Sequence, residues 1–255
     1  MTNTGPAQLL TVWEAGLGRP GADRALLLHR AARPGAADGE LLSVQVGERE
    51  ADLYGLRRTL FGERMEVRVE CGACGEPVEF DLSTDELAGQ RAGRTSGGHE
   101  RLRVTEGEWA VEFRLPTVAD LDAVAGAGVD SSAPDARRLL LARCLLSAAR
   151  AGEPAPVERL PGVLPEAVLR RISETAERAD PTAEVTLKIA CPECGETTPA
   201  ELDITSYLWT ELDAWARDLL LDVHLLAGAY GWSEPEILAL SPLRRRYYLE
   251  LCADV

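Results

Sequence analysis

The clearest chemical signal in the sequence is two Cys-x-x-Cys pairs, Cys71 with Cys74 and Cys191 with Cys194. The two-residue gap lets both thiolates of a pair face one metal ion. The glycine after each second cysteine permits a backbone conformation that points amide N–H groups at sulfur. Four thiolates complete a tetrahedron with no open position, so the ion would be structural and could not activate water. The pattern therefore predicts one Zn²⁺ held by all four cysteines, as in a zinc ribbon.

Two other uses of these pairs remain open, a redox Cys-x-x-Cys and a set of unliganded thiols. A redox motif normally occurs once, at the start of a helix that follows a strand. Here the motif occurs twice, between predicted strands, and a glycine follows each time, which favours metal binding. The remaining cysteines, Cys144 and Cys252, lie on predicted apolar helix faces, so we interpret them as small buried hydrophobic residues.

The two pairs belong to a repeated unit. Residues 66–76, followed by Asp81-Leu82-Ser83, are similar in sequence to residues 184–196, followed by Asp203-Ile204-Thr205. Apolar and polar residues alternate before each pair and again after the first, which is typical of half-buried strands. The sequence thus predicts a strand, a knuckle and a strand twice, with half of the metal site in each copy.

Periodicity and turn residues place the other elements. Helices are predicted at residues 7–15, 21–32, 48–61, 117–125, 135–149, 166–179 and 206–229, with a capped helix at 233–238 and a last helix at 242–251. A hairpin is predicted at 102–115 and a second short strand at 200–204. Loops are predicted at 31–39 and 89–99, and a break is predicted at 126–134. The predicted fold class is α+β, in which helical N- and C-terminal parts are joined by a discontinuous zinc-ribbon-like β element with a helical insertion. The corresponding division of the chain is 1–62, 63–115, 116–182, 183–205 and 206–255.

Composition excludes several classes of protein. A hydrophobic content of 45% over 255 residues can build a substantial core, so disorder is excluded as the main state. A formal net charge of −15 makes generic binding to a phosphate backbone unlikely. Asp218 and Asp222 interrupt the most apolar helical stretch, so we expect no membrane span. The first residues contain no basic stretch followed by an apolar run, so we expect no secretory signal and a cytoplasmic location.

Other catalytic or nucleotide-binding patterns are missing from the sequence. The three histidines, His29, His99 and His224, are scattered, and no Ser or Cys lies in a nucleophile elbow near them. No glycine-rich phosphate loop is present. Carboxylates along residues 211–222 fit a solvated helix face better than an acid–base pair. We therefore expect no catalytic residues and no small-molecule substrate.

One cluster in the C-terminal part has the residue types of a protein interface, namely aromatic side chains next to arginines. Most of the tryptophans and tyrosines follow residue 200. Filling of the helical core is the alternative role for these aromatic residues, and we assign it to Trp215. The predicted partner-contact residues are Trp232, Arg244, Arg245, Arg246, Tyr247 and Tyr248.

Several stretches together resemble a known family. Residues 13–16, 23–26, 46–49, 56–57, 61–62, 71–76, 113–117 and 120–121 recur in this order in bacterial proteins of contractile-tail gene clusters. Residues 224–227, 230–238 and 245–249 resemble the baseplate-hub protein family of T4-type phages. The resemblance implies a non-enzymatic baseplate or baseplate-assembly component of a phage tail-like contractile injection system, which contacts hub or wedge subunits.

Two other functions compete with that expectation. A zinc-ribbon adaptor could bind nucleic acid, or the transcription or RNA-processing apparatus, through residues 244–248, although the acidic balance disfavours it. An enzyme could use the Cys-x-x-Cys pairs for thiol exchange, which predicts reactivity with an alkylating agent.

Overall fold

The computed structural model describes residues 5–84, 101–127, 133–156, 160 and 162–253. The predicted loop at 89–99 and most of the predicted break at 126–134 lie outside these residues. The structure combines helices with small antiparallel sheets, so the predicted α+β class is confirmed. Two compact units make up the chain, one from Met1–Pro34 with Thr205–Val255 and the other from Gly35–Ile204.

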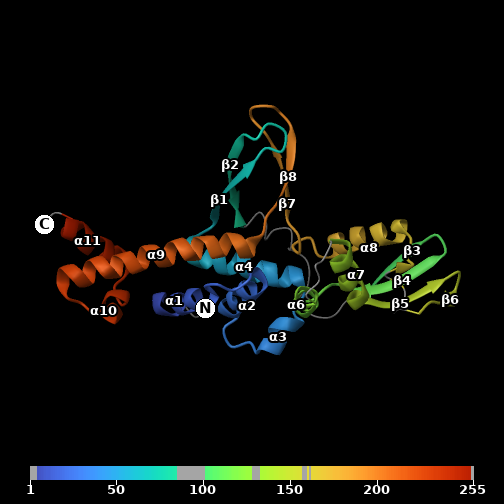
Figure 1. The fold of residues 1–255 in the computed structure, drawn as a ribbon, viewed down its shortest axis with the longest axis horizontal. Coiled ribbons are helices and arrows are strands. Elements are labelled where there is room, and N and C mark those ends of the chain that lie inside the picture. Colours follow the sequence, from blue (N-terminus) through green and yellow to red (C-terminus); the bar gives the residue numbers. More distant parts are fainter. Residues whose placement is uncertain (1–4, 85–100, 128–132, 157–159, 161, 254–255) are drawn as a thin grey trace. The chain divides into compact units, whose positions relative to one another are not determined.

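The first unit is helical (Figure 1). Its helices are α1 (Pro6–Gly16), α2 (Gly21–Ala32), α9 (Ile204–Tyr230), α10 (Glu234–Leu238) and α11 (Pro242–Ala253). Buried leucines one or two helical turns apart line one face of α9, namely Leu208, Leu212, Leu219 and Leu226. The capping box predicted at Ser233 is present, because Glu236 accepts hydrogen bonds from the Ser233 backbone N–H and hydroxyl.

The N-terminal part of α9 packs closely on α1. The Trp209 ring lies directly against Gly16, where a Cβ atom would stand 2.2 Å from a ring carbon. The Arg24 guanidinium lies 4.5 Å from the centroid of the same ring. The Trp13 indole N–H donates to Asp213 at 2.8 Å. Residues near both ends of the chain therefore form one packed helical unit.

The second unit holds the strands and the remaining helices. In chain order its elements are α3 (Asp38–Ser43), α4 (Val46–Phe61), β1 (Arg64–Glu70), β2 (Pro77–Ser83), β3 (Arg101–Glu106), β4 (Trp109–Arg114), α6 (Val118–Gly126), α7 (Ala133–Cys144), β5 (Leu145–Arg150), β6 (Glu153–Pro154), α8 (Glu166–Ala179), β7 (Thr186–Ala190) and β8 (Thr197–Glu201). Strands β3 to β6 form a four-stranded antiparallel sheet in sequence order.

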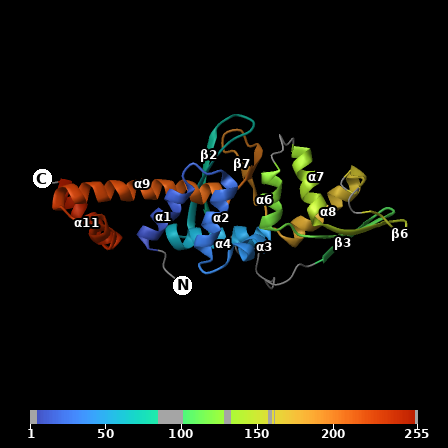
Figure 2. The ribbon, with the colours of Figure 1, turned by 60° about the horizontal axis from the view of Figure 1, so that its bottom comes forward.

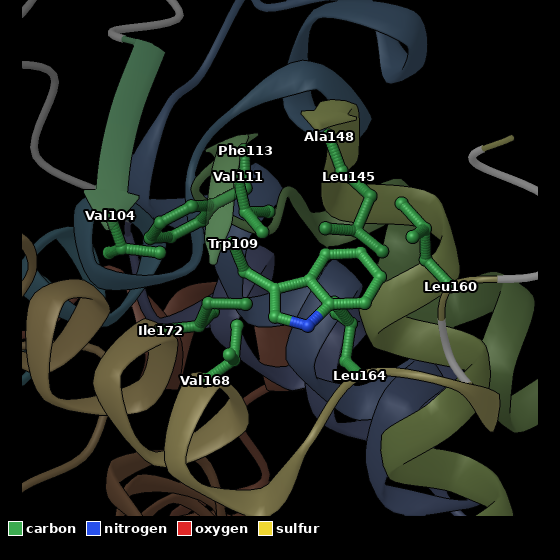
Figure 3. Close-up of a cluster of buried hydrophobic side chains, with 10 residues drawn as sticks. All are labelled: Val104, Trp109, Val111, Phe113, Leu145, Ala148, Leu160, Leu164, Val168 and Ile172. Atoms are coloured by element: carbon green, nitrogen blue, oxygen red, sulfur yellow. The ribbon is translucent and has the colours of Figure 1, made fainter. Parts of the chain in front are cut away.

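Helix α8 covers this sheet and encloses a hydrophobic core. Val168 and Ile172 of α8 belong to the same buried cluster as Trp109 of β4, and Figure 3 shows their side chains next to the Trp109 indole. The fully buried members of the cluster include Val111 and Phe113 of β4. The apolar stripe of α8 has the helical period that the sequence predicts, and the helix has the predicted bounds.

Three sequence-based expectations about element bounds are wrong. The helix predicted at 135–149 ends at Cys144, and residues 145–150 form β5. Pairing with β4 places Ala148 opposite Val111, so tertiary packing overrides a local pattern that also suits a helix. The loop predicted at 31–39 ends two residues early, because α3 begins at Asp38. The short strand predicted at 200–204 is also displaced, since β8 ends at Glu201 and α9 begins at Ile204.

Candidate metal centre

The four cysteines lie at the tips of two β hairpins. Strand β1 pairs with β2, so that Val67 faces Phe80, and β7 pairs with β8, so that Leu187 faces Ala200. Both hairpins alternate exposed and half-buried residues near the tip. The two hairpins lie side by side (Figure 1), as the turned view also shows (Figure 2). The strand, knuckle and strand predicted from the repeat are therefore present in both copies.

The backbone of the two knuckles is nearly identical. In the first, the Cys71 N–H donates to the Glu76 carbonyl and the Gly75 N–H to the Cys71 carbonyl, both at 2.9 Å. The second repeats both bonds at 2.9 Å, from Cys191 to Glu196 and from Gly195 to Cys191. Gly75 and Gly195 have φ angles of +75° and +74°, which L side chains rarely adopt. This is why the sequence has glycine after each second cysteine.

The hairpins bring the four thiol groups together. All four Sγ atoms lie within 4.8 Å of one another. The Sγ atoms of Cys71 and Cys194 are 3.6 Å apart, and those of Cys74 and Cys191 are 3.7 Å apart. A tetrahedral ion with Zn–S bonds of about 2.3 Å requires S···S distances of about 3.8 Å. The four-sulfur geometry is thus compatible with one metal ion.

The thiols differ in their electrostatic surroundings. Hydrogen bonds from the Cys74 and Ala73 backbone N–H groups, and one from Thr198, lower the pKa of Cys71 to about 6. The Glu76 N–H lowers the pKa of Cys74, but contacts with the sulfurs of Cys194 and Cys71 outweigh it and raise that pKa to about 12. One thiolate in such a cluster disfavours the next. A bound divalent cation would offset this repulsion and favour four thiolates.

A long-range cap positions the segments that lead into both hairpins. Asp180, shortly before β7, accepts a hydrogen bond from the Gly47 N–H at the start of α4 at 2.9 Å. The Thr182 hydroxyl donates to the Gly47 carbonyl at 3.0 Å. A Cβ atom on Gly47 would lie 1.8 Å from the Asp180 carboxylate. The sequence carries no local signal for this contact, because its partners are far apart in the chain.

A second polar cluster holds the insertion together. The carboxylate of Asp120 is almost completely buried and accepts hydrogen bonds from Arg114, Arg143 and Thr117. Burial opposes its ionisation, but the hydrogen bonds from Arg114 and Thr117 outweigh that effect, so the pKa of Asp120 lies well below its usual range. Burial raises the pKa of nearby Cys144 to about 11. The cluster therefore has the properties of a structural ion pair beside an unreactive thiol.

The predicted partner-contact residues divide into internal and exposed members. Trp232 stacks on Tyr230, with ring centroids 4.6 Å apart, and meets Tyr248 edge-on at 4.9 Å. Arg245 is buried, and its Nε donates to Asp222 at 3.1 Å. These contacts fasten α11 to α9.

The exposed members lie on the outer face of α11. Arg244 and Tyr247 are exposed, and Arg246 forms an exposed ion pair with Glu250.

His29 is buried on α2 and His224 is exposed on α9, whereas His99 lies outside the described residues. The two described histidines therefore belong to different environments.

Comparison with known families identifies the chain. The family model described as T4 bacteriophage base plate protein matches residues 36–207, more than half of the sequence. The chain belongs to this family. No curated protein and no solved structure matches the chain. The base plate family match spans both cysteine pairs and ends before α10 and α11, and it confirms the family expected from the sequence.

Among the residues that the structure describes, no helix is both long enough and apolar enough to cross a bilayer.

Proposed function

We propose that this base plate family member is a non-enzymatic structural or assembly component of a phage tail-like contractile injection system. The observation that carries the proposal is the family match over residues 36–207. The protein is made in the cytoplasm and acts through contacts with other baseplate subunits, either within the particle or during its assembly. Catalysis plays no part in this role.

The four cysteines bind one structural Zn²⁺ in this proposal. Support comes from the close approach of four sulfurs and from the match between their spacing and tetrahedral coordination. Cys71 and Cys74 come before the insertion, and Cys191 and Cys194 come after it. The ion would therefore hold together two strand pairs that are distant in the chain, and metal binding would contribute to the stability of the fold.

Hub or wedge subunits are the proposed partners, and the exposed side chains of α9 and α11 are the proposed contact. Seven of the ten large apolar side chains that are exposed in the described residues lie between positions 220 and 251. Arg244, Arg246 and Tyr247 lie on the outer side of α11, where a partner could reach them. Trp232, Arg245 and Tyr248 support this surface from within, because they attach α11 to α9.

Quantitative mass spectrometry of purified contractile particles and of the particle-free lysate tests the role directly. A fixed stoichiometry to a known baseplate subunit would support a structural component. Presence in the lysate alone, together with loss of particles when the gene is deleted, would support an assembly factor. Normal particles in the deletion strain, without this chain in them, would contradict both.

A further inference from the structure

One contact across the two knuckles has no counterpart in the repeat. The Gly72 backbone N–H donates to the Thr198 hydroxyl oxygen at 3.1 Å. The same hydroxyl donates its hydrogen toward the Cys71 sulfur, with 3.8 Å between Oγ1 and Sγ. Thr198 belongs to β8, and the other two residues belong to the first knuckle. A single side chain therefore connects the second hairpin to both the backbone and a thiol of the first.

Alignment of the two repeats shows what occupies the equivalent positions. When Cys71 is aligned with Cys191, Gly72 corresponds to Pro192, and Thr198 corresponds to Val78. Val78 and Thr198 are both half-buried, so their positions are equivalent in environment as well as in sequence. Proline has no N–H to donate, and valine has no hydroxyl to accept or donate. The pair Gly72 and Thr198 thus has both the N–H donor and the hydroxyl, whereas the equivalent pair, Pro192 and Val78, has neither.

This pairing has a physical reason. A hydroxyl can accept one hydrogen bond while it donates another, so Thr198 satisfies the Gly72 N–H and still directs its own hydrogen at sulfur. A β-branched side chain on a strand has restricted rotation about χ1, which favours this orientation of the hydroxyl. Groups that hydrogen-bond to metal ligands orient those ligands and raise metal affinity.

We propose that Thr198 is a positioning residue for the metal centre, which fixes the Cys71 thiolate and ties the first knuckle to the second hairpin. The inference rests on the proposed structural metal. It assigns the two halves of the site different roles, since the Cys71 side is held by a hydrogen-bonded bridge, whereas Pro192 and Val78 at the equivalent positions lack the groups to form one.

Thr198→Val is the direct test, because it keeps the shape of the side chain and removes the hydroxyl. Zn²⁺ affinity is measured by competition with a chromogenic chelator on the full chain, and the thiolate-to-metal absorption of the Co²⁺ form reports on the sulfur environment. We expect Thr198→Val to weaken Zn²⁺ binding about 10-fold or more and to shift the Co²⁺ absorption. Thr198→Ser keeps the hydroxyl and should restore both properties to nearly the unchanged level.

Matched variants separate the hydroxyl from general effects on the hairpin. Thr197→Val changes an exposed neighbour on the same strand and should leave affinity unchanged. Gly72→Ala keeps the N–H, and its Cβ would meet Thr198 only at an ordinary contact distance of 3.7 Å, so affinity should be retained. Gly72→Pro removes the N–H, and proline already occupies the equivalent position in the second knuckle. It should weaken binding, and it should add little when combined with Thr198→Val.

The outcomes distinguish this inference from the metal proposal itself. Unchanged affinity and an unchanged Co²⁺ spectrum in Thr198→Val would overturn the positioning role while the metal centre stands. Equal losses in Thr198→Ser and Thr198→Val would also overturn it, because the hydroxyl would then be irrelevant. Failure of the unchanged chain to bind any metal would overturn both.

Discussion

Replacement of Asp120 by asparagine tests how the insertion is held together. The carboxylate is 1% exposed and accepts two hydrogen bonds from the Arg114 guanidinium, at 2.5 and 3.0 Å. Further bonds come from Arg143 Nε at 2.8 Å and from the Thr117 N–H and hydroxyl at 2.9 Å each. Asparagine has nearly the same shape, but it turns an NH₂ group toward these donors and leaves the guanidinium of Arg114 without a carboxylate partner, with only the Leu115 and Arg143 carbonyls as acceptors.

The expected loss in the free energy of unfolding is about 3 kcal/mol, the lower end of the range for breaking one partner of a buried ion pair. The lower end applies because Arg143 is 38% exposed and water can solvate it. Glu174→Gln is the control. Glu174 pairs with Arg171 on the exposed surface of α8, so its loss should cost about 0.5 kcal/mol or less. Urea denaturation gives both values.

The dependence on pH gives an independent check of the same ion pair. The pKa of Asp120 is lower in the folded protein than in the unfolded chain, where it is about 3.9. Its stabilising contribution is therefore complete above about pH 4 and is lost as the pH falls toward the folded-state pKa. The difference between the unchanged chain and Asp120→Asn should shrink below about pH 4. A difference of less than about 0.5 kcal/mol at pH 7 would refute this account of the cluster.

Three further predictions concern close packing and the metal. Gly47→Ala should destabilise the second unit by about 1 to 3 kcal/mol, because the new methyl group displaces the Asp180 carboxylate; an unchanged urea midpoint would argue against the cap. Gly16→Ala should cost a similar amount, since its Cβ would overlap the Trp209 ring, whereas Gly21→Ala meets no atom within 4 Å and should be neutral in the same assay. Incubation with a strong chelator should lower the melting temperature, and added Zn²⁺ should restore it; a melting curve insensitive to both treatments would count against a structural ion.

Features encoded by local spacing could be predicted from the sequence. The Cys-x-x-Cys-Gly turns and the alternation beside them predict the knuckles and strands, because glycine at positive φ and a period of two are local requirements. The bounds of α8 follow from its helical period. The capping box from Thr117 to Asp120 is also recognisable, since its partners are three residues apart.

Features that depend on distant partners could not be predicted in this way. No local pattern indicates that Asp180 caps α4 at Gly47 or that Thr198 reaches Cys71. Residues 145–150 form a strand only because β4 offers an edge for pairing. Arginines beside aromatic residues predicted an interface, but sequence alone could not show that Arg245 is buried against Asp222.

The most direct test of the metal centre is the zinc content of the purified chain, measured by elemental mass spectrometry together with thermal melting. We expect one Zn²⁺ for each unchanged chain. Cys71→Ser combined with Cys191→Ser should abolish metal binding and lower both the melting temperature and the solubility, whereas Cys252→Ser, which leaves the four-cysteine group intact, should retain the ion. Unchanged zinc content and melting in the double variant would contradict the assignment of a structural zinc to these four cysteines.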